Sequence, residues 1–291
     1  MPVESGWRGS LGGDHKRASA PELRREGPGY VLLTVDVGNT HTVIALFRGK
    51  ELVHSWRLSS RHEATADELG IALRSLFNQH GYAAAAVRGL ALATVVPSLR
   101  DVWLEIAAAQ IGCEAVSVGV GADGGLCLDV ERPADVGADR ICDCVAAWRL
   151  YGTPVIVVDC GTATKIEAVV DGGRYVGGVI APGIAVSSEA LFSRAALLHR
   201  VDLAVPVRTV GRNTAEQVQA GIIFGFAGQV DALVERVRTE MGGARRVVAT
   251  GGLCHLIAPV SRTITDVEDA LTLHGLRLIY EAVRESAAGV P

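Results

Sequence analysis

Two short acidic turns, each set between apolar runs, hold the residues best suited to phosphate chemistry. The first is "DVGNTHT", residues 36–42, and the second is "DCGTAT", residues 159–164. In both turns a glycine lets the backbone approach a phosphate closely, and hydroxyl side chains can donate hydrogen bonds. The aspartate that opens each turn can serve a divalent cation or its bound water. The pair therefore predicts a site for the phosphates of a nucleotide.

A single D-x-G turn says little about function, because aspartate caps turns and glycine readily adopts a positive φ. Repetition of the turn at matching places in two strand-turn-strand units, residues 31–58 and 154–180, favours a phosphate site. The sequence contains neither the G-x-x-x-x-G-K-[ST] of P-loop proteins nor a G-x-G-x-x-G that opens a helix after a strand. We therefore exclude the P-loop and dinucleotide-binding classes.

The elements that must position these turns alternate between strand and helix, which indicates an α/β fold. We expect strands at 31–37, 42–48, 51–58, 89–94, 115–118 and 245–250, and helices at about 66–80, 98–110, 138–150, 187–198, 213–240 and 269–287. The plan of the chain restarts at residue 154, which predicts two similar lobes, 30–152 and 153–291, with a ligand site between them. Residues 1–29, rich in Gly, Pro, Ser and charge, are expected to form a disordered N-terminal tail.

The composition limits the classes of partner. The 291 residues are 49% hydrophobic and 21% charged, and their formal net charge of -4 offers no basic surface for nucleic acid. No apolar run reaches the roughly 18 residues of a membrane span, and the N-terminus has no signal-peptide apolar region. The six cysteines form no C-x-x-C pair and are expected to be reduced thiols. We expect a cytoplasmic protein that acts on a small molecule, with neither nucleic acid nor membrane as a partner.

A third motif, "GADR" at residues 137–140, opens an amphipathic segment. Its aspartate, Asp139, would lie where a helix N-terminus leaves N–H donors free. Such an aspartate can simply be a favourable first-turn residue. Next to a phosphate site it can also be the carboxylate base that phosphoryl transfer to an alcohol requires.

Seven motifs in a fixed order give the sequence a specific resemblance. They are "DVGNT", "GADR", "DCGTAT", "GGVIAPGI", "GRNT", "ATGGL" and "LTLHGLRLIYE". In this order, from residue 31 to about residue 285, they resemble type III pantothenate kinase. The resemblance implies an α/β fold of duplicated ribonuclease-H-like (actin-like ATPase) domains with a cleft between two lobes. It also implies ATP-dependent phosphorylation of pantothenate to 4'-phosphopantothenate, the first step of coenzyme A biosynthesis.

The same resemblance implies roles for individual residues, with Asp139 as the catalytic base. The residues implied to line ATP are Asp36, Val37, Gly38, Asn39, Thr40, His41, Thr42, Val43 and Thr162. Those implied to bind pantothenate are Gly137, Ala138, Asp139, Arg140, Thr214 and Val130. Asp36 would hold Mg²⁺, Asp159 would bind a monovalent cation, K⁺ or NH₄⁺, and the protein would be a homodimer. For Thr214, an ordinary helix start explains the sequence equally well.

Two positions depart from the pattern of the family. Val130 stands where a tyrosine of the substrate pocket is usual, and Lys165 stands where a small hydroxyl residue is usual. Lys165, in the place that Thr42 holds in the first turn, either points to the phosphate or cation site, where it could replace the monovalent cation, or extends to solvent. These departures leave two alternatives: a non-catalytic or regulatory paralogue with eroded activity, and a kinase for another small alcohol.

Overall fold

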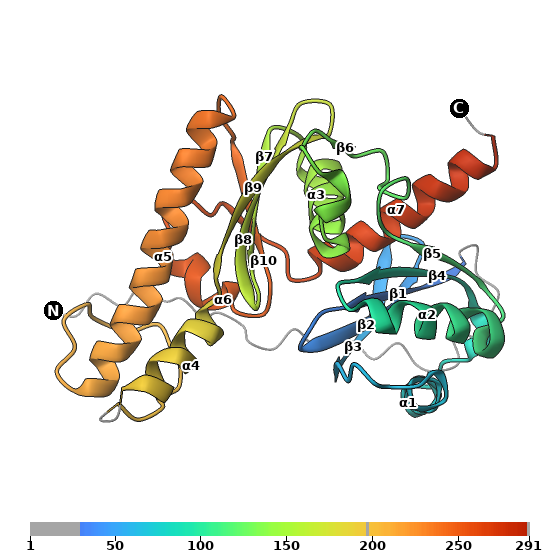
Figure 1. The fold of residues 1–291 in the computed structure, drawn as a ribbon, viewed down its shortest axis with the longest axis horizontal. Helices are drawn as coiled ribbons and strands as arrows, with labels where there is room; N and C mark the ends of the chain where they lie inside the picture. Colours follow the sequence, from blue (N-terminus) through green and yellow to red (C-terminus); the bar gives the residue numbers. More distant parts are fainter. Residues whose placement is uncertain (1–29, 196–197, 290–291) are drawn as a thin grey trace, which may run out of the picture.

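The computed structural model describes residues 30–195 and 198–289. It contains two β-sheets, with helix α3 (Ala138–Tyr151) and helix α7 (Leu271–Ala287) packed between them (Figure 1). The tail expected at residues 1–29 lies outside the described residues.

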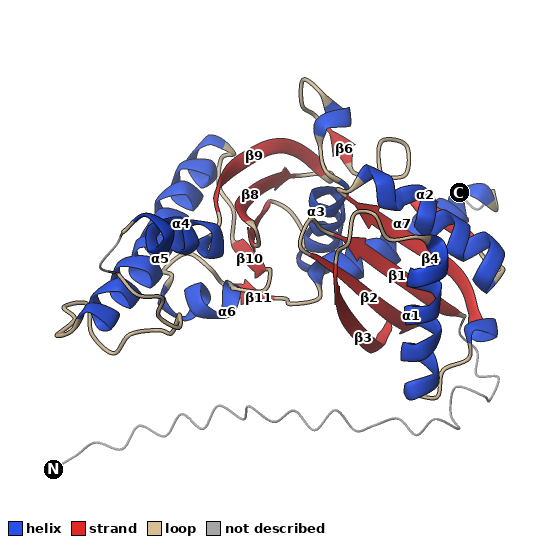
Figure 2. Ribbon diagram, turned by 60° about the horizontal axis from the view of Figure 1, so that its bottom comes forward, coloured by secondary structure: helices blue, strands red, loops and turns tan. Residues whose placement is uncertain are grey.

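The first sheet has the strand order β3-β2-β1-β4-β5. Its strands are β1 (Val31–Val37), β2 (His41–Arg48), β3 (Glu51–Ser59), β4 (Val87–Thr94) and β5 (Glu114–Ser117). Helices α1 (Ala66–Gln79) and α2 (Pro97–Glu105) cover its outer face (Figure 2). A capping box fixes the start of α1, because Thr65 and Glu68 satisfy each other's free backbone N–H groups.

The second sheet has the strand order β11-β10-β7-β8-β9-β6. Its strands are β6 (Cys127–Leu128), β7 (Val155–Cys160), β8 (Ala163–Val170), β9 (Arg174–Pro182), β10 (Arg246–Thr250) and β11 (Asp266–Val267). The helices of this half are α4 (Ile184–Arg194), α5 (Thr214–Glu240) and α6 (Cys254–Ile257). From β7 onward the second sheet repeats the first: in both, the order is third, second, first, fourth, fifth strand of the unit, and the second sheet adds the two-residue strand β6 beside β9. This repetition confirms the predicted fold class, α/β with duplicated ribonuclease-H-like domains.

Alternation along the strands of the first sheet distributes its hydrophobic residues between an outer core and a central core. On β1, Leu33 faces the outer core under α1 and α2, whereas Leu32 faces a central core. The central core also contains residues of both α3 and α7, such as Val145 and Ile279. The lobe boundary at residues 152 and 153 stays a prediction. The structure adds that α7, from the second predicted lobe, packs against β1 and β4 of the first.

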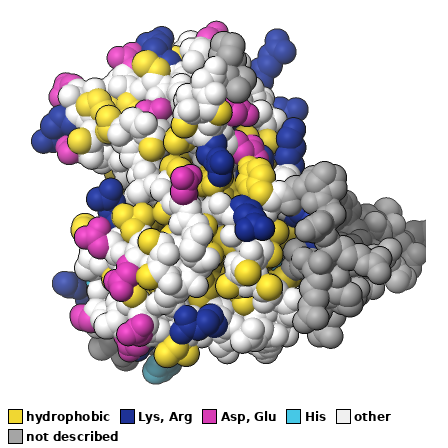
Figure 3. Space-filling model, turned by 90° about the vertical axis from the view of Figure 1, so that its right-hand side faces the viewer, with side chains coloured by type: hydrophobic (Ala, Val, Ile, Leu, Met, Phe, Trp, Pro, Cys, Tyr) yellow, Lys and Arg dark blue, Asp and Glu magenta, His cyan; other side chains and the backbone are white. Residues whose placement is uncertain are grey.

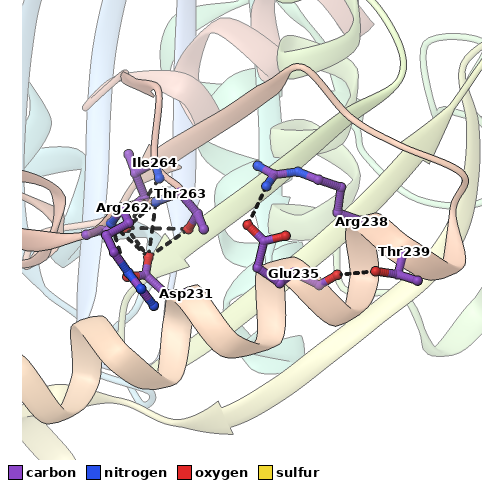
Figure 4. Close-up of polar contacts among 8 residues, drawn as sticks. Asp231, Glu235, Arg238, Thr239, Arg262, Thr263 and Ile264 are labelled. Carbon is purple, nitrogen blue, oxygen red and sulfur yellow. Dashed lines mark hydrogen bonds and ion pairs between the residues drawn. The ribbon is translucent and has the colours of Figure 1, made fainter.

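A buried aspartate ties the long helix α5 to the segment that precedes β11. Asp231 accepts hydrogen bonds from Ser261 Oγ at 2.6 Å, from Thr263 Oγ1 at 2.8 Å and from the backbone N–H groups of Arg262 and Thr263 (Figure 4). Burial alone would raise the pKa of Asp231, but these donors lower it below its usual value.

On the face shown in Figure 3, acidic and basic side chains are interspersed with hydrophobic ones.

The strand registers show that the two acidic turns differ in length. Asp36 pairs with Val43 across β1 and β2, whereas Asp159 pairs with Lys165 across β7 and β8. Residues 38–41 connect the first pair of strands and residues 161–163 connect the second, so the second connection is one residue shorter. Lys165 therefore corresponds to Val43. The expected equivalence of Lys165 with Thr42 is wrong.

Candidate active site

The N-terminus of α3 places Asp139 among groups from both sheets. Gly137 is the N-cap residue of α3, and its carbonyl oxygen accepts a hydrogen bond from Ile141 N–H at 3.1 Å. Most of the helix is buried in the central core, which fixes its first turn. Asp139, in that turn, directs its carboxylate toward β8 rather than toward the free N–H groups of its own helix.

Lys165 on β8 joins Asp139 to the second acidic turn. Its Nζ lies 2.5 Å from Oδ2 of Asp139 and 2.7 Å from Oδ2 of Asp159. Burial lowers the pKa of Lys165, but the two carboxylates raise it well above its usual range. The side chain is only 14% exposed, so it does not extend to solvent. Of the two predicted alternatives, the structure shows the one in which Lys165 points inward, toward Asp159, where the monovalent cation was expected.

Asp36, at the end of β1, completes a group of three carboxylates. Its pKa is raised to about 7, first by burial and then by the negative charges of Asp139 and Asp159, against the opposite effect of Lys165. Burial also raises the pKa of Asp159, against the opposite effect of Lys165. The structure thus brings together Asp36, Asp139 and Asp159, which come from β1, α3 and β7.

The two carboxylate oxygens of Asp139 have different surroundings. Oδ2 accepts a hydrogen bond from Lys165, whereas Oδ1 is buried and has no hydrogen-bond partner among the described residues. Oδ1 faces Gly137, where a Cβ atom would lie only 2.6 Å away. A glycine at residue 137 therefore keeps open the space beside an unsatisfied carboxylate oxygen.

The first acidic turn contains both exposed polar side chains and buried ones. Asn39, Thr40 and His41 are exposed, whereas the side chains of Val37 and Thr42 are buried. A serine that was not predicted supports the turn, since Ser60 Oγ donates to the Gly38 carbonyl oxygen at 2.7 Å and lies 2.9 Å from Thr42 Oγ1. The sequence feature that could have indicated this role is the position of Ser60, a hydroxyl residue directly after β3.

Arg140 already binds a carboxylate of the protein itself. Its Nε lies 2.6 Å from Oε1 of Glu167, and its Nη2 lies 2.9 Å from Oε2. Tyr175 completes the group, because its hydroxyl donates to Glu167 at 2.7 Å and accepts from Arg140 Nη2 at 2.5 Å. Glu167 and Tyr175 were not predicted, although Glu167 lies two residues after Lys165, on the same face of β8. Val130 lies in the same region, where a Cβ atom on Gly177 would be 3.9 Å from its Cγ1.

Two further residues predicted to contact a ligand are Thr214 and Thr162. Thr214 is the first residue of α5, and Asn213 caps that helix by accepting from Glu216 N–H at 2.9 Å. Thr214 also lines a cavity of about 410 Å³ between α4 and α5, whose lining does not include Asp36, Asp139 or Asp159. Thr162 is exposed, and its carbonyl oxygen accepts from Gly183 N–H at 3.1 Å.

The residues present differ in how well they fit the two expected metal ions. Asp36 fits Mg²⁺, which proteins hold through one or two carboxylates together with the phosphates of a substrate. Its pKa is raised mainly by burial and also by the negative charges of Asp139 and Asp159, and a divalent cation would compensate both effects. Asp159 does not fit a monovalent cation in the same way, because the ammonium of Lys165 already lies against its carboxylate. Within the described ranges no group of three or more His, Cys, Asp or Glu residues could by itself hold a metal ion.

Comparison with known proteins decides the family. A sequence profile of type III pantothenate kinase matches residues 32–236. The type III pantothenate kinase of Moorella thermoacetica is 47% identical over 251 residues, which cover 86% of this chain and 99% of that protein. The chain belongs to the type III pantothenate kinase family. The relative of the same name from Geobacter sulfurreducens is 44% identical over 255 residues, 88% of this chain and 100% of its own.

A solved structure supports the fold of this pantothenate kinase family member. A conserved Campylobacter jejuni protein, named for the Baf family of transcriptional activators, aligns with a TM-score of 0.54 at 16% identity. The alignment covers 88% of this chain and 99% of that one. At this identity the likeness concerns the fold alone. Among the described helices, none has the length and apolar character to cross a membrane.

Proposed function

We propose that this protein transfers the γ-phosphoryl group of ATP to pantothenate and releases 4'-phosphopantothenate and ADP, the first step of coenzyme A biosynthesis. One observation carries the proposal: Asp139 has one oxygen held by Lys165 and the other without a partner, beside the acidic turns of both sheets. Membership of the type III pantothenate kinase family supports the choice of substrate. The alternatives of a non-catalytic paralogue and of a kinase for another alcohol gain no support from the named relatives.

In the proposed reaction, Asp139 Oδ1 accepts the proton of the substrate hydroxyl while the hydroxyl oxygen attacks the γ-phosphorus and ADP leaves. Lys165 holds the other oxygen and so fixes the direction of the carboxylate. The backbone of residues 36–43 and Thr162 would line the phosphates of ATP. Mg²⁺, held by Asp36 together with those phosphates, would neutralise the charge that develops during transfer.

Pantothenate would lie at the N-terminus of α3, beside Gly137, Ala138, Arg140 and Val130. Arg140 uses Nε and Nη2 to bind Glu167 and Tyr175, whereas Nη1 makes no hydrogen bond to a described residue. Nη1 is therefore the donor we assign to the substrate carboxylate. Thr214, which lines a separate cavity, would contact pantothenate from the partner subunit of a homodimer.

The homodimer itself is supported by exposed apolar side chains in the second half of the chain. They lie on β9, on α4 and before α5, at Ile180, Val186, Leu191, Val207 and Val210. We also place the protein in the cytoplasm, where its six free thiols would remain reduced. The monovalent cation predicted at Asp159 is not part of the proposed reaction, because Lys165 Nζ lies 2.7 Å from the carboxylate that would bind it.

The direct test is turnover of pantothenate by the purified chain with ATP and Mg²⁺, followed by mass spectrometry of the product and by release of ADP. The proposed function requires 4'-phosphopantothenate to accumulate in step with ADP. ADP release with pantetheine or glycerol, but not with pantothenate, would show a kinase for another alcohol. Nucleotide binding without any turnover would instead show a non-catalytic paralogue.

A further inference from the structure

Lys165 holds the position between two carboxylates in which a small cation would otherwise be needed. Its Nζ contacts Oδ2 of Asp139 and Oδ2 of Asp159, and the side chains of these aspartates are only 22% and 15% exposed. The position follows from the strand register, in which Asp159 and Lys165 are direct partners on neighbouring antiparallel strands. The short connection of residues 161–163 creates this pairing, and Val43 takes the corresponding position in the first sheet.

The surroundings of Lys165 are strongly acidic. Asp143, on the next turn of α3, is buried, and its hydrogen bond from Thr272 Oγ1 is 2.6 Å long. Lys165 lowers the pKa of Asp36, of Asp143 and of Asp159, each of which burial raises. One buried positive charge thus serves several carboxylates from both halves of the molecule. Buried charges without such compensation are strongly destabilising.

An alkylammonium group and a monovalent cation are equivalent in charge, and the head group of lysine is a substituted ammonium ion. The lysine differs in being covalently attached, so it cannot dissociate or be exchanged for another ion. Its ammonium group also donates a hydrogen bond to Asp139. A hydrogen bond has a preferred direction, whereas the contact of a spherical ion does not.

We propose that Lys165 replaces the monovalent cation and positions Asp139, so that this enzyme requires no added K⁺ or NH₄⁺. The activity measurement that tests this inference rests on the proposed kinase function, whereas the measurement of the unfolding temperature does not. A lysine in this role acts through Asp139 and is a positioning residue.

The test compares the native protein with Lys165→Thr and with a matched control, Lys50→Thr. Lys50 is exposed in the turn between β2 and β3, so its loss leaves the carboxylate cluster intact. Kinase activity and the temperature of thermal unfolding are measured in KCl, NH₄Cl and choline chloride at one constant ionic strength, because general screening then stays fixed. Choline is the reference cation, since it is too large for the space that Nζ occupies.

For the native protein and for Lys50→Thr we expect kcat/KM to change by less than about twofold among the three salts. For Lys165→Thr in choline we expect kcat/KM to fall by about tenfold or more, and K⁺ or NH₄⁺ to restore it. The same ions should raise the unfolding temperature of Lys165→Thr alone, since only that variant gains a cation site in its folded state.

Activation of the native enzyme by K⁺, or equal responses of Lys165→Thr and the native protein in both measurements, would overturn the inference. The measurement on the native protein stands even if Lys165→Thr does not fold. If no protein phosphorylates pantothenate in any salt, the proposed function fails, while the unfolding temperatures still test the replacement of the cation.

Discussion

A Cβ atom added to Gly137 would lie 2.6 Å from Oδ1 of Asp139, the oxygen that we assign to the substrate proton. The backbone of Gly137, with φ of -59° and ψ of 145°, is one that any residue can adopt. The glycine is therefore required by the carboxylate beside it and not by the conformation of the chain. A substitution of Gly137 should therefore affect the reaction at Asp139 more than the folding of the chain.

Gly137→Ala should lower kcat by about 10²-fold, because the added methyl group displaces the carboxylate from its reactive position. The unfolding temperature should change little. Both are measured on purified protein, with Gly228→Ala as the control, since no atom lies within 4 Å of a Cβ at that exposed position in α5. An unchanged kcat in Gly137→Ala would show that Oδ1 is not the reacting oxygen.

Asp139→Asn should lower kcat by about 10²- to 10⁴-fold, since an amide keeps the shape of the side chain but cannot accept the proton. Asp135→Asn is the matched control, because Asp135 lies just before α3, in an exposed ion pair with Arg132. Steady-state kinetics at saturating ATP and pantothenate separate the two variants. Equal rates in Asp139→Asn and the native enzyme would remove Asp139 from the role of base.

The raised pKa of Asp36 predicts a stability that falls as the pH rises from about 4 to about 7. In that range the folded carboxyl still binds a proton, whereas the same group in the unfolded chain has lost it. The contribution to the free energy of unfolding should decrease by up to about 4 kcal/mol across this window. Urea denaturation at several pH values measures it.

Asp36→Asn should reduce this pH dependence, because the amide does not titrate. Asp143 and Asp159, whose pKa values burial also raises, would still contribute to the remaining slope. The same slope for Asp36→Asn and the native protein would mean that Asp36 is ionised in the folded state across this range.

The proposed homodimer predicts that Val186→Asp weakens self-association. Val186 lies on α4 and is 48% exposed, so a charge there should raise the dissociation constant by about tenfold or more if the residue is buried between subunits. Ile71→Asp is the control, since Ile71 is 61% exposed on α1 of the other half. Sedimentation velocity over a range of concentrations provides the measurement, and a native protein that stays monomeric would contradict the proposal.

Much of the fold could be predicted because strands and helices leave strong periodic patterns. The strand at 31–37 and the helix at 138–150 match β1 and α3 closely. In contrast, β6 and β11 have two residues each, which is too short for any alternation to be recognised. The start of α4 at Ile184, three residues before the expected helix, follows directly from the end of β9 at Pro182.

The sequence predicts which residues belong to the site, but it does not predict which of them contact one another. Asp36, Asp139 and Asp159 each stand in a recognisable motif. The direction of the Lys165 side chain depends on the register of β7 and β8 and on the position of α3. The sequence pattern of a single segment contains no information on either. Arg140 illustrates the same limit, because its partners Glu167 and Tyr175 lie 27 and 35 residues further along the chain.

The packing of α7 has a consequence for the order of events during synthesis on the ribosome. The inner face of the first sheet is covered by the last long helix of the chain, which contacts β1 and β4. Leu32 and Phe47 on that face share a core with Leu276 and Ile279 of α7. The half of the protein that is made first therefore lacks part of its own core until α7 has left the ribosome and packed against β1 and β4.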